Sequence, residues 1–422
     1  MSVLDSCLLH LVVISRRFCA LHPDMLKEHL TNYIHSLNTV VTDTTLEITD
    51  ENLQLHIHSI KICEVTPPDI KHVDVKGVTL EYHIFKLDCD GPGMEEMEDG
   101  EEDVPAAQHW ILPSQDFHGL WDSLIYDDHI KQQVVDVIEG TSVVASVIVG
   151  GDILSWKSYI FLHRALSTSK TSLCKALAHK LSIRLGDRYD YGQLVEVNSH
   201  SLFSKWFSES GKLVQKMFSK IMELVEDPRA LVCVLIDEVE SLTASRASTQ
   251  SGTDPSDALR VVNAVLTQLD HIKRYSNVLI LTTSNISGSI DLAFVDRADI
   301  KQYIGLPSQS AIYQIYYSCL TELKRGSLVS GDKILSLREL QLTNMEETSF
   351  TKASLKLWEI AKLSEGLSGR ALRKIPFLAL ALFVQRSRNL CATPVCTFLE
   401  AMEKAIRKQI NDQNILKSAE NL

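Results

Sequence analysis

The 422-residue chain is long enough for roughly two or three domains, and with 45% apolar and 23% charged residues it can bury a sizeable core. Its formal net charge of −12 argues against broad nucleic-acid binding, which requires a basic surface. The nine cysteines are scattered without a C-x-x-C pair, which predicts a reduced, intracellular protein.

The N-terminal part of the chain is predicted to be rich in β-strands. The apolar run Cys7–Ser15 is too short to span a bilayer and has no basic stretch before it, so we expect a buried helix or strand there. Polar and apolar residues alternate over Leu53–Ile62 and Gly77–Leu87, which is typical of strands, and Pro67-Pro68 marks a turn between them. His56 and His58 would share one strand face; without a third ligand, a solvated face is preferred to a metal site.

The stretch DCDGPGMEEMEDGEEDVP, Asp88–Pro105, combines glycine, proline and dense acid. Such a composition cannot bury a core, so it predicts a flexible loop or linker. We expect it to end a smaller N-terminal α+β domain over residues 1–105.

Residues 106–307 alternate short apolar runs with helical patterns, which predicts an α/β domain with a parallel sheet. A helix over Ala258–Ile272 would place Val261, Val265 and Leu269 on one stripe. Residues 308–422 show no strand-like run and are predicted to form a helical domain, with a helix over Ala311–Lys324. The predicted strands of the α/β domain are Ser158–Leu162, Leu194–Asn198, Ala230–Asp237 and Asn277–Asn285.

Polar residues follow two of these strands, at the sheet edge where open α/β folds bind ligands. Asp237 and Glu238 end the strand in LVCVLIDEVES, where one carboxylate could hold Mg²⁺ through water and the other could polarise an attacking water. Asn285 ends the strand in LILTTSN and could reach a γ-phosphate. Acids or Asn after a strand are also common in ordinary turns, but their order behind a phosphate-binding loop favours an NTPase.

That loop lies in FLHRALSTSKTSLCKALA, Phe161–Ala178. Lys170-Thr171 closes it, and Leu173, Leu177 and Leu181 predict the helix that should follow. The Walker pattern G-x-x-x-x-G-K-[ST], however, requires glycine where this chain has Arg164 and Ser169.

Several stretches together resemble the pachytene checkpoint protein 2 family of AAA+ ATPases, over about His83–Leu380. The resemblance implies an AAA+ core with a helical lid and an N-terminal domain that binds an adaptor. It implies hexamers that use Mg-ATP to remodel HORMA-domain proteins in meiosis and the spindle checkpoint, in the nucleus, on chromosomes and also in the cytoplasm. It implies neither direct nucleic-acid binding nor a membrane. The stretches are HGLWDSLIYD (His118–Asp127), SLFSKWFSESGKLV (Ser201–Val214), VLIDEVESL (Val234–Leu242), TTSN (Thr282–Asn285), FVDRADIKQYI (Phe294–Ile304) and SEGLSGRALRKIP (Ser364–Pro376).

The same resemblance implies residue roles. Asp237 and Glu238 correspond to Walker B, with Thr171 and Asp237 as the magnesium ligands. Asn285 corresponds to sensor one, Arg297 to the arginine finger and Arg370 to sensor two. Trp206 and Phe207 correspond to the pore loop, where large rings in a polar setting could grip an extended chain; packing in the core is the alternative. The nucleotide-binding loop corresponds to Arg164, Ala165, Leu166, Ser167, Thr168, Ser169, Lys170, Thr171 and Ser172.

This loop departs from the family pattern HGPPGTGKT, because Arg164, Ser167 and Ser169 stand at its glycines. A serine forced into a left-handed conformation costs about 1–2 kcal/mol, and its Cβ would crowd the phosphates. We therefore expect weakened ATP binding, although Lys170 and the helix N-terminus remain an anion site. A weak or inactive AAA+ subunit that binds partners or joins mixed hexamers stays open beside the active ATPase. A metabolic P-loop kinase would not explain Trp206-Phe207 or the helical C-terminal part.

Overall fold

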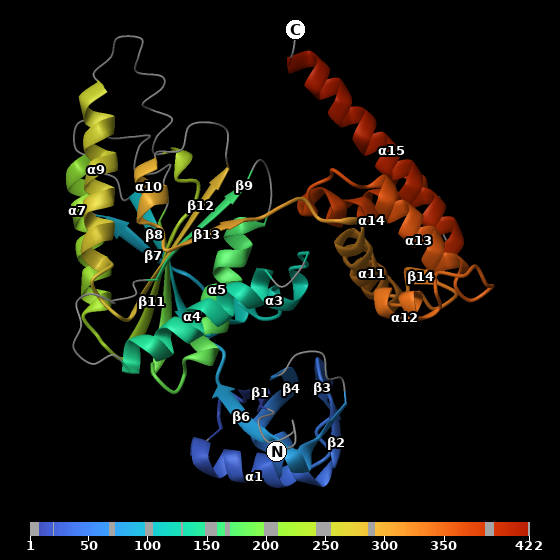
Figure 1. Ribbon diagram of the computed structural model, residues 1–422, viewed down its shortest axis with the longest axis horizontal. Helices are drawn as coiled ribbons and strands as arrows, with labels where there is room; N and C mark the ends of the chain where they lie inside the picture. Colours follow the sequence, from blue (N-terminus) through green and yellow to red (C-terminus); the bar gives the residue numbers. More distant parts are fainter. Residues whose placement is uncertain are drawn as a thin grey trace.

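The computed structural model shows a small N-terminal domain, an α/β domain and a helical lid, coloured blue, cyan to light orange, and darker orange to red in Figure 1. No helix in the described part of the chain is both long and apolar enough to cross a membrane. The structure describes residues 8–19, 21–66, 72–97, 104–127, 130–147, 158–164, 169–197, 210–241, 255–285, 292–384 and 392–420.

The N-terminal domain is built on a four-stranded sheet in the order β3-β4-β1-β6. Strand β1 runs antiparallel to β4 and parallel to β6, and α1 packs on the sheet through Leu26, Leu30 and Ile34. The Cys7–Ser15 run is therefore confirmed as a strand over its described residues. The elements are β1 (Leu8–Ser15), α1 (Pro23–Ser36), β2 (Thr39–Val41), β3 (Thr44–Leu46), α2 (Glu51–His56), β4 (Ile57–Thr66), β5 (His72–Asp74) and β6 (Thr79–Phe85).

The strand predicted over Leu53–Ile62 is wrong in its first half. The carboxylate of Asp50 accepts the backbone N–H groups of Asn52 and Leu53, and this N-cap starts helix α2. His56 therefore ends a helix while His58 lies on β4, so the two do not share a strand face. The predicted turn at Pro67-Pro68 lies outside the described residues.

The acidic stretch Asp88–Pro105 was predicted to be a loop, and its described residues include strand pairing. β7 (Gly93–Met97) pairs antiparallel with β8 (Val104–Leu112) and forms one edge of the large sheet. An edge strand with one neighbour can be built from backbone hydrogen bonds alone, without an apolar face in its sequence. The acidic composition of this stretch therefore did not indicate β7.

The α/β domain contains a seven-stranded sheet in the order β13-β9-β12-β11-β10-β8-β7. The pairs from β13 to β10 are parallel, which confirms the predicted parallel core, and β8 joins β10 antiparallel. The short edge strand β13 was not predicted. The strands not yet given are β9 (Ser158–Arg164), β10 (Tyr191–Val197), β11 (Ala230–Ile236), β12 (Val278–Asn285) and β13 (Ile300–Tyr303).

Helices cover both faces of this sheet (Figure 1). On β11, Val232, Val234 and Ile236 face the cluster with α7 and α9, whereas Leu231 and Cys233 face the cluster with α4 and α5. The predicted stripe of α9 is confirmed by its burial in the first of these clusters. The helices are α3 (Leu120–Ser123), α4 (Ile130–Val147), α5 (Lys170–Arg184), α7 (Ser210–Val225), α9 (Pro255–Ile272) and α10 (Leu292–Arg297).

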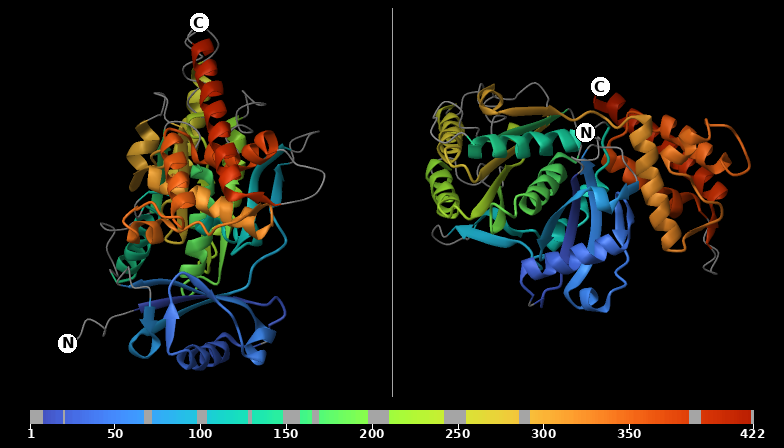
Figure 2. Two further views of the ribbon diagram at one scale, coloured as in Figure 1. Left: turned by 90° about the vertical axis from the view of Figure 1, so that its right-hand side faces the viewer. Right: turned by 60° about the horizontal axis from the view of Figure 1, so that its bottom comes forward.

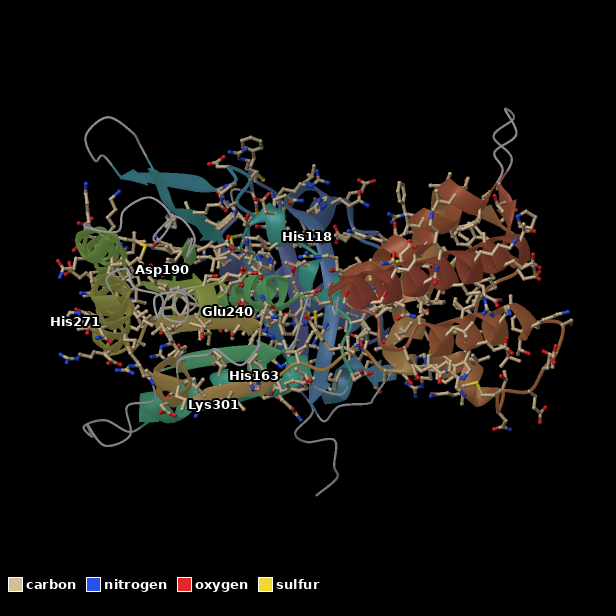
Figure 3. The ribbon with its side chains drawn as sticks, turned by 90° about the horizontal axis from the view of Figure 1, so that it is seen from above. His118, His163, Asp190, Glu240, His271 and Lys301 are labelled. Atoms are coloured by element: carbon tan, nitrogen blue, oxygen red, sulfur yellow. The ribbon has the colours of Figure 1, made fainter. Side chains whose placement is uncertain are left out.

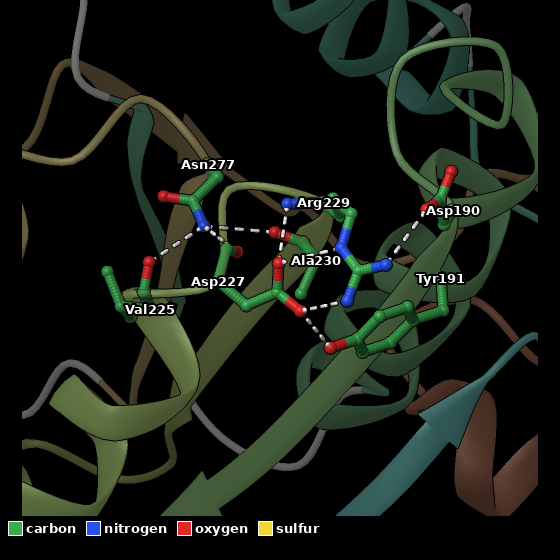
Figure 4. Close-up of polar contacts among 7 residues, drawn as sticks. All are labelled: Asp190, Tyr191, Val225, Asp227, Arg229, Ala230 and Asn277. Carbon is green, nitrogen blue, oxygen red and sulfur yellow. Dashed lines mark hydrogen bonds and ion pairs between the residues drawn. The ribbon is translucent and has the colours of Figure 1, made fainter.

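The start of β11 is held by a polar cluster at its N-terminal end (Figure 4). The side-chain amide of buried Asn277 lies 3.0 Å from the carbonyls of Val225, Asp227 and Ala230. Arg229 and the hydroxyl of Tyr191 donate to the Asp227 carboxylate. These contacts fix the end of the sheet opposite the one that carries the polar strand ends.

The lid is helical, as predicted, with a core of its own around Tyr316, Leu357 and Phe398. It also contains one very short pair of parallel strands, β14 and β15, which the sequence did not indicate. Figure 2 shows the lid beside the α/β domain and the N-terminal domain beneath it. The lid elements are α11 (Gln309–Arg325), β14 (Val329–Ser330), α12 (Leu337–Leu342), α13 (Lys352–Leu363), α14 (Gly369–Phe383), β15 (Thr393–Pro394) and α15 (Val395–Glu420).

Candidate nucleotide-binding site

The Asp237 carboxylate, directly after β11, lies at the centre of the candidate site. The hydroxyl of Thr171 lies 2.9 and 2.8 Å from its two oxygens. The hydroxyl of buried Thr283, on the neighbouring strand β12, also donates to this carboxylate. Hydroxyl and carboxylate oxygens are the ligands that Mg²⁺ takes in proteins, so the donor set around Asp237 fits this ion.

Lys170 begins helix α5 and is almost fully buried. Its ammonium lies 2.6 Å from the side-chain oxygen of Asn285, at the end of β12. The side-chain nitrogen of Asn285 donates in turn to Glu238 at 3.3 Å, and its backbone N–H donates to Glu240 at 2.9 Å. Parallel strand order and the start of α5 thus bring together residues that are up to 115 positions apart.

Glu238 has a left-handed backbone, with φ of 54°. Its N–H donates to the Thr283 hydroxyl at 3.1 Å, and the next N–H, of Val239, donates to the Thr283 carbonyl at 3.0 Å. A non-glycine residue in this conformation is held by its surroundings and is found most often at functional sites. The strained turn directs the Glu238 carboxylate to Asn285.

Four residues of the nucleotide-binding loop, 165–168, lie outside the described residues, but both ends of the loop are described. Arg164 ends β9 beside Asn285, and Ser169 precedes α5 with φ of −69°. The left-handed strain expected for a serine in this loop is therefore wrong for Ser169. Ser172 lies in the first turn of α5, as expected for a loop that ends in a helix.

A cavity of about 360 Å³ opens between the α/β domain and the lid, next to Ser169. Tyr126 lines it and donates its hydroxyl to the carbonyl of Ser169 at 3.2 Å. Gly369 and Arg373 of lid helix α14 line the opposite wall. A cavity of this size can hold a drug-sized ligand, and its position beside Lys170 suits the base and sugar of a nucleotide.

His163 lies near the end of β9, the strand that leads into the nucleotide-binding loop. Figure 3 labels it together with Glu240. The His163 ring stacks on Phe161 and contacts Tyr303, with ring centres 5.6 Å apart in each pair. Burial lowers the pKa of His163 below its usual value. The neutral ring packs the end of β9 against Tyr303 of β13 and adds no charge near the phosphate site.

The remaining predicted residues lie apart from this group. Arg297 is paired with Asp270, at 3.0 and 3.1 Å, and with the carbonyl of Ala293. Arg370 is exposed on α14, one residue after Gly369 in the cavity wall. The predicted pore-loop residues, Trp206 and Phe207, lie outside the described residues.

Sequence reasoning missed Thr283, Glu240, Tyr126 and Arg373. Thr283 and Glu240 stood inside motifs that were already singled out, beside Asn285 and Glu238, so their proximity was a usable signal. Tyr126 and Arg373 reach the site only because the lid and the segment before α4 fold over it. Nothing local in the sequence indicates that contact.

Three family models match the chain in order. They are "TRIP13 N-terminal domain" over residues 5–90, "ATPase family associated with various cellular activities (AAA)" over residues 162–306, and "TRIP13-like, AAA+ ATPase lid C-terminal domain" over residues 308–410. Each model falls within one of the three domains, and residues 91–161, which contribute β8 and α4 to the α/β domain, lie between the first two models.

Curated relatives match most of the chain. The Xenopus tropicalis pachytene checkpoint protein 2 homolog is 54% identical over 87% of this chain and 85% of its own length. The mouse homolog is 48% identical over 98% of this chain and 96% of its own length. Among solved structures, Caenorhabditis elegans PCH-2 matches with a TM-score of 0.74 at 32% identity, covering 96% of this chain and 99% of that one. A chain of an Escherichia coli HORMA:CdnC:Trip13 complex shares the fold, with a TM-score of 0.52 at 18% identity, covering 70% of this chain and 94% of that one.

Proposed function

The chain belongs to the pachytene checkpoint protein 2 (TRIP13) family of AAA+ ATPases, and we propose that it hydrolyses ATP to remodel HORMA-domain proteins. The observation that carries the proposal is that Lys170, Thr171, Asp237, Glu238 and Asn285 belong to one hydrogen-bonded group, joined through the hydroxyl of Thr283. These are the groups that phosphoryl transfer to water requires, and they meet beside a cavity of nucleotide size.

Each residue has a role that its geometry supports. Thr171 and Asp237 present oxygen atoms that would hold Mg²⁺, and Lys170 presents its ammonium to phosphate oxygens. Glu238 and Asn285, 3.3 Å apart, would orient a water molecule. Bound ATP supplies the phosphoanhydride bond whose hydrolysis drives remodelling.

The choice of HORMA-domain proteins as substrates rests on similarity to other proteins. One solved structure with this fold comes from the Escherichia coli HORMA:CdnC:Trip13 complex. Together with the family membership, this favours a HORMA substrate and a HORMA-type adaptor for the present chain. We place this activity in the meiotic and spindle checkpoints, in the nucleus and on chromosomes.

A direct test measures ATP binding and phosphate release by the purified full-length chain. We expect magnesium-dependent hydrolysis that Glu238→Gln abolishes while ATP binding persists, because Lys170 and Asp237 remain. Glu223→Gln, on the exposed side of α7, is the matched control and should leave both unchanged. A wild-type chain that binds ATP but hydrolyses no more than the Glu238→Gln variant would exclude the ATPase proposal.

A second candidate is an AAA+ subunit with weak or no activity, which serves as a scaffold or joins mixed hexamers. Its specific support is the replacement of the family's loop glycines by Arg164, Ser167 and Ser169. Absence of both ATP binding and hydrolysis, with intact binding to a HORMA protein, would favour this candidate over the first.

Ring assembly and substrate grip belong to the first candidate. Arg297 would act on the nucleotide of a neighbouring subunit, so we expect hexamers in sedimentation experiments with ATP.

Trp206→Ala should abolish remodelling of a HORMA protein and preserve ATP binding, because the Trp206 indole would grip the substrate chain and not the nucleotide. A monomer at all concentrations, or a Trp206→Ala chain that remodels normally, would contradict these two assignments.

A further inference from the structure

Three metal-ligating side chains meet in the N-terminal domain, far from the nucleotide site in sequence. His10 lies on β1, and Glu81 and His83 lie on the adjacent parallel strand β6, where His10 is directly opposite Glu81. Their ligand atoms converge: His10 Nδ1 is 3.1 Å from His83 Nε2 and 3.5 Å from Glu81 Oε2, and His83 Nε2 is 3.9 Å from Glu81 Oε1. Both histidines are buried, whereas the Glu81 side chain is 38% exposed.

The hydrogen bonds identify at least one of these atoms as an acceptor. The Arg184 guanidinium, from the last turn of α5, donates to His10 Nδ1 at 2.6 Å, so this nitrogen carries a lone pair. His83 donates to the backbone of Ile183. In the tautomer that uses Nδ1 of His83 for this bond, His83 Nε2 is a second acceptor, 3.1 Å from His10 Nδ1. With the Glu81 carboxylate beside them, the two histidines form a group that could bind a cation.

The spacing of the three atoms suits a small tetrahedral ion. Zn²⁺ with metal–ligand distances of about 2.0–2.2 Å places neighbouring ligand atoms about 3.3–3.6 Å apart. The two histidine nitrogens are 3.1 Å apart here, and each lies 3.5 or 3.9 Å from a different oxygen of Glu81, whose partly exposed carboxylate would turn to share one oxygen with both. Two imidazoles and one carboxylate are ligands that Zn²⁺ favours, with a fourth position left for water. The His83 bond to Ile183 would fix its ring as outer-shell bonds do in known zinc sites.

We propose that His10, Glu81 and His83 form a Zn²⁺-class site at the seam between the N-terminal domain and α5, and that the metal competes there with Arg184. In this structure the Arg184 guanidinium lies against His10 Nδ1, where the metal would bind. The positive charge of Lys180, on the same helix, also acts on His83. Both positive charges oppose a divalent ion, and Glu81 offsets one of them. Metal binding therefore requires Arg184 to turn away, which would loosen the contact between the N-terminal domain and the helix that begins at Lys170.

The test titrates the full-length chain with Zn²⁺ in competition with a chromophoric chelator. We expect a single high-affinity site that His83→Ala removes and Glu81→Gln weakens about tenfold or more, since each deletes one ligand or its charge. The decisive variant is Arg184→Met, which should raise the Zn²⁺ affinity about tenfold or more because a unit charge next to the ion is removed. Co²⁺ should give the visible absorption of a tetrahedral nitrogen and oxygen site in the wild-type chain.

The matched control is His58→Ala, which removes an exposed histidine from β4 of the same domain and should leave the Zn²⁺ affinity unchanged. Circular dichroism checks that each variant is folded; if Arg184→Met fails to fold, Glu81→Gln carries the test from a partly exposed position. Zn²⁺ binding that persists in the His83→Ala chain would assign it to other groups, such as cysteines, and overturn the proposal. An Arg184→Met affinity equal to or below that of the wild type would overturn the competition.

Discussion

Individual side chains at the nucleotide site depend on partners that hold them in place. The Asp237 carboxylate accepts hydrogen bonds from Thr171 and Thr283, which come from a helix and a neighbouring strand. Thr283 also accepts the N–H of Glu238, so one hydroxyl positions both acids. Such bonds to a charged group contribute about 1.5–3 kcal/mol each, enough to decide where a magnesium ligand points.

Thr283→Val should therefore lower the kcat/KM of ATP hydrolysis about 10–100-fold, the equivalent of one bond to a charged acceptor. Valine keeps the shape of the side chain and removes only the hydroxyl. Thr282→Val is the control, because Thr282 is equally buried on β12 but its hydroxyl lies near the Ile160 carbonyl instead. Equal losses in both variants, measured by steady-state kinetics, would mean that Thr283 acts only through stability.

His179 links residue chemistry to the stability of α5. Burial, followed by the nearby His118 and Lys180, lowers the pKa of His179 to about 4. Between pH 4 and the usual value of 6.5 the unfolded chain binds a proton here that the folded chain does not, so stability rises with pH across that window. His179 should then account for a loss of up to about 3 kcal/mol in the free energy of unfolding as the pH falls from 7 to 4.

Urea unfolding at several pH values measures this loss. His179→Gln removes the titrating group but keeps an acceptor for the Ser114 N–H, so its stability should fall less steeply with acid. His271→Gln, on the exposed end of α9, should keep the steep wild-type dependence. Parallel curves for wild type and His179→Gln would show that His179 does not carry the effect.

At the scale of elements, the site is made by strand ends and one helix start. Strands β11 and β12 are parallel neighbours, so Asp237 and Asn285 emerge at the same edge of the sheet, and α5 presents Lys170 between them. The glycine replacements all lie from Arg164, the last residue of β9, to Ser169, the residue before α5, while the ends of β11 and β12 keep their polar residues. Any defect in catalysis should therefore be confined to this one loop.

Restoring the family sequence of the nucleotide-binding loop should strengthen ATP binding and hydrolysis. The combination Arg164→Gly, Ala165→Pro, Leu166→Pro, Ser167→Gly and Ser169→Gly should raise ATP affinity and turnover by orders of magnitude. Ser169→Gly alone should give only a small part, because Ser169 has a negative φ and no left-handed strain to relieve. The rebuilt chain with Glu238→Gln should bind ATP without hydrolysing it. If the unmodified chain already turns over ATP at about 1 s⁻¹ or faster, the loop is not the limiting element.

At the scale of the whole molecule, the segment Leu120–Asp127 contacts all three domains. Asp122 accepts Lys61 of the N-terminal domain at 2.6 Å, and the carbonyl of Ser123 accepts Arg373 of the lid. Tyr126 contacts the nucleotide-binding loop at Ser169. Asp127 accepts the N–H of Ser308 at 2.6 Å, directly before lid helix α11. The lid is thus tied to the segment that lines the cavity.

Asp127→Ala should loosen the lid and weaken ATP binding a few-fold to about tenfold, since hydrogen bonds to a charged group are lost at the lid's first residue. The unfolding temperature of the core should change little because Asp127 lies near the surface. Asp187→Ala, an exposed acid after α5, is the control. Fluorescent nucleotide titration and hydrogen exchange of α11 report the two effects, and unchanged values in both would contradict a lid tether.

The sequence by itself determined the β11, β12 and α5 assignments, the acids and amide at the strand ends, and the family. These features are local: alternation, a helical stripe or a motif is complete within about ten to twenty residues. Local patterns gave a wrong prediction at α2, where the N-cap Asp50 was overlooked, and missed β7, an edge strand without an apolar pattern.

Only the tertiary structure decided which of these residues meet. The pairing of Lys170 with Asn285 spans 115 positions and that of Thr283 with Asp237 spans 46, and the lid cavity joins two domains. The convergence of His10 with His83 joins residues 73 positions apart and depends on the register of β1 with β6. Such contacts follow from sheet order, strand register and domain packing, which depend on the summed burial of the whole core rather than on any local pattern.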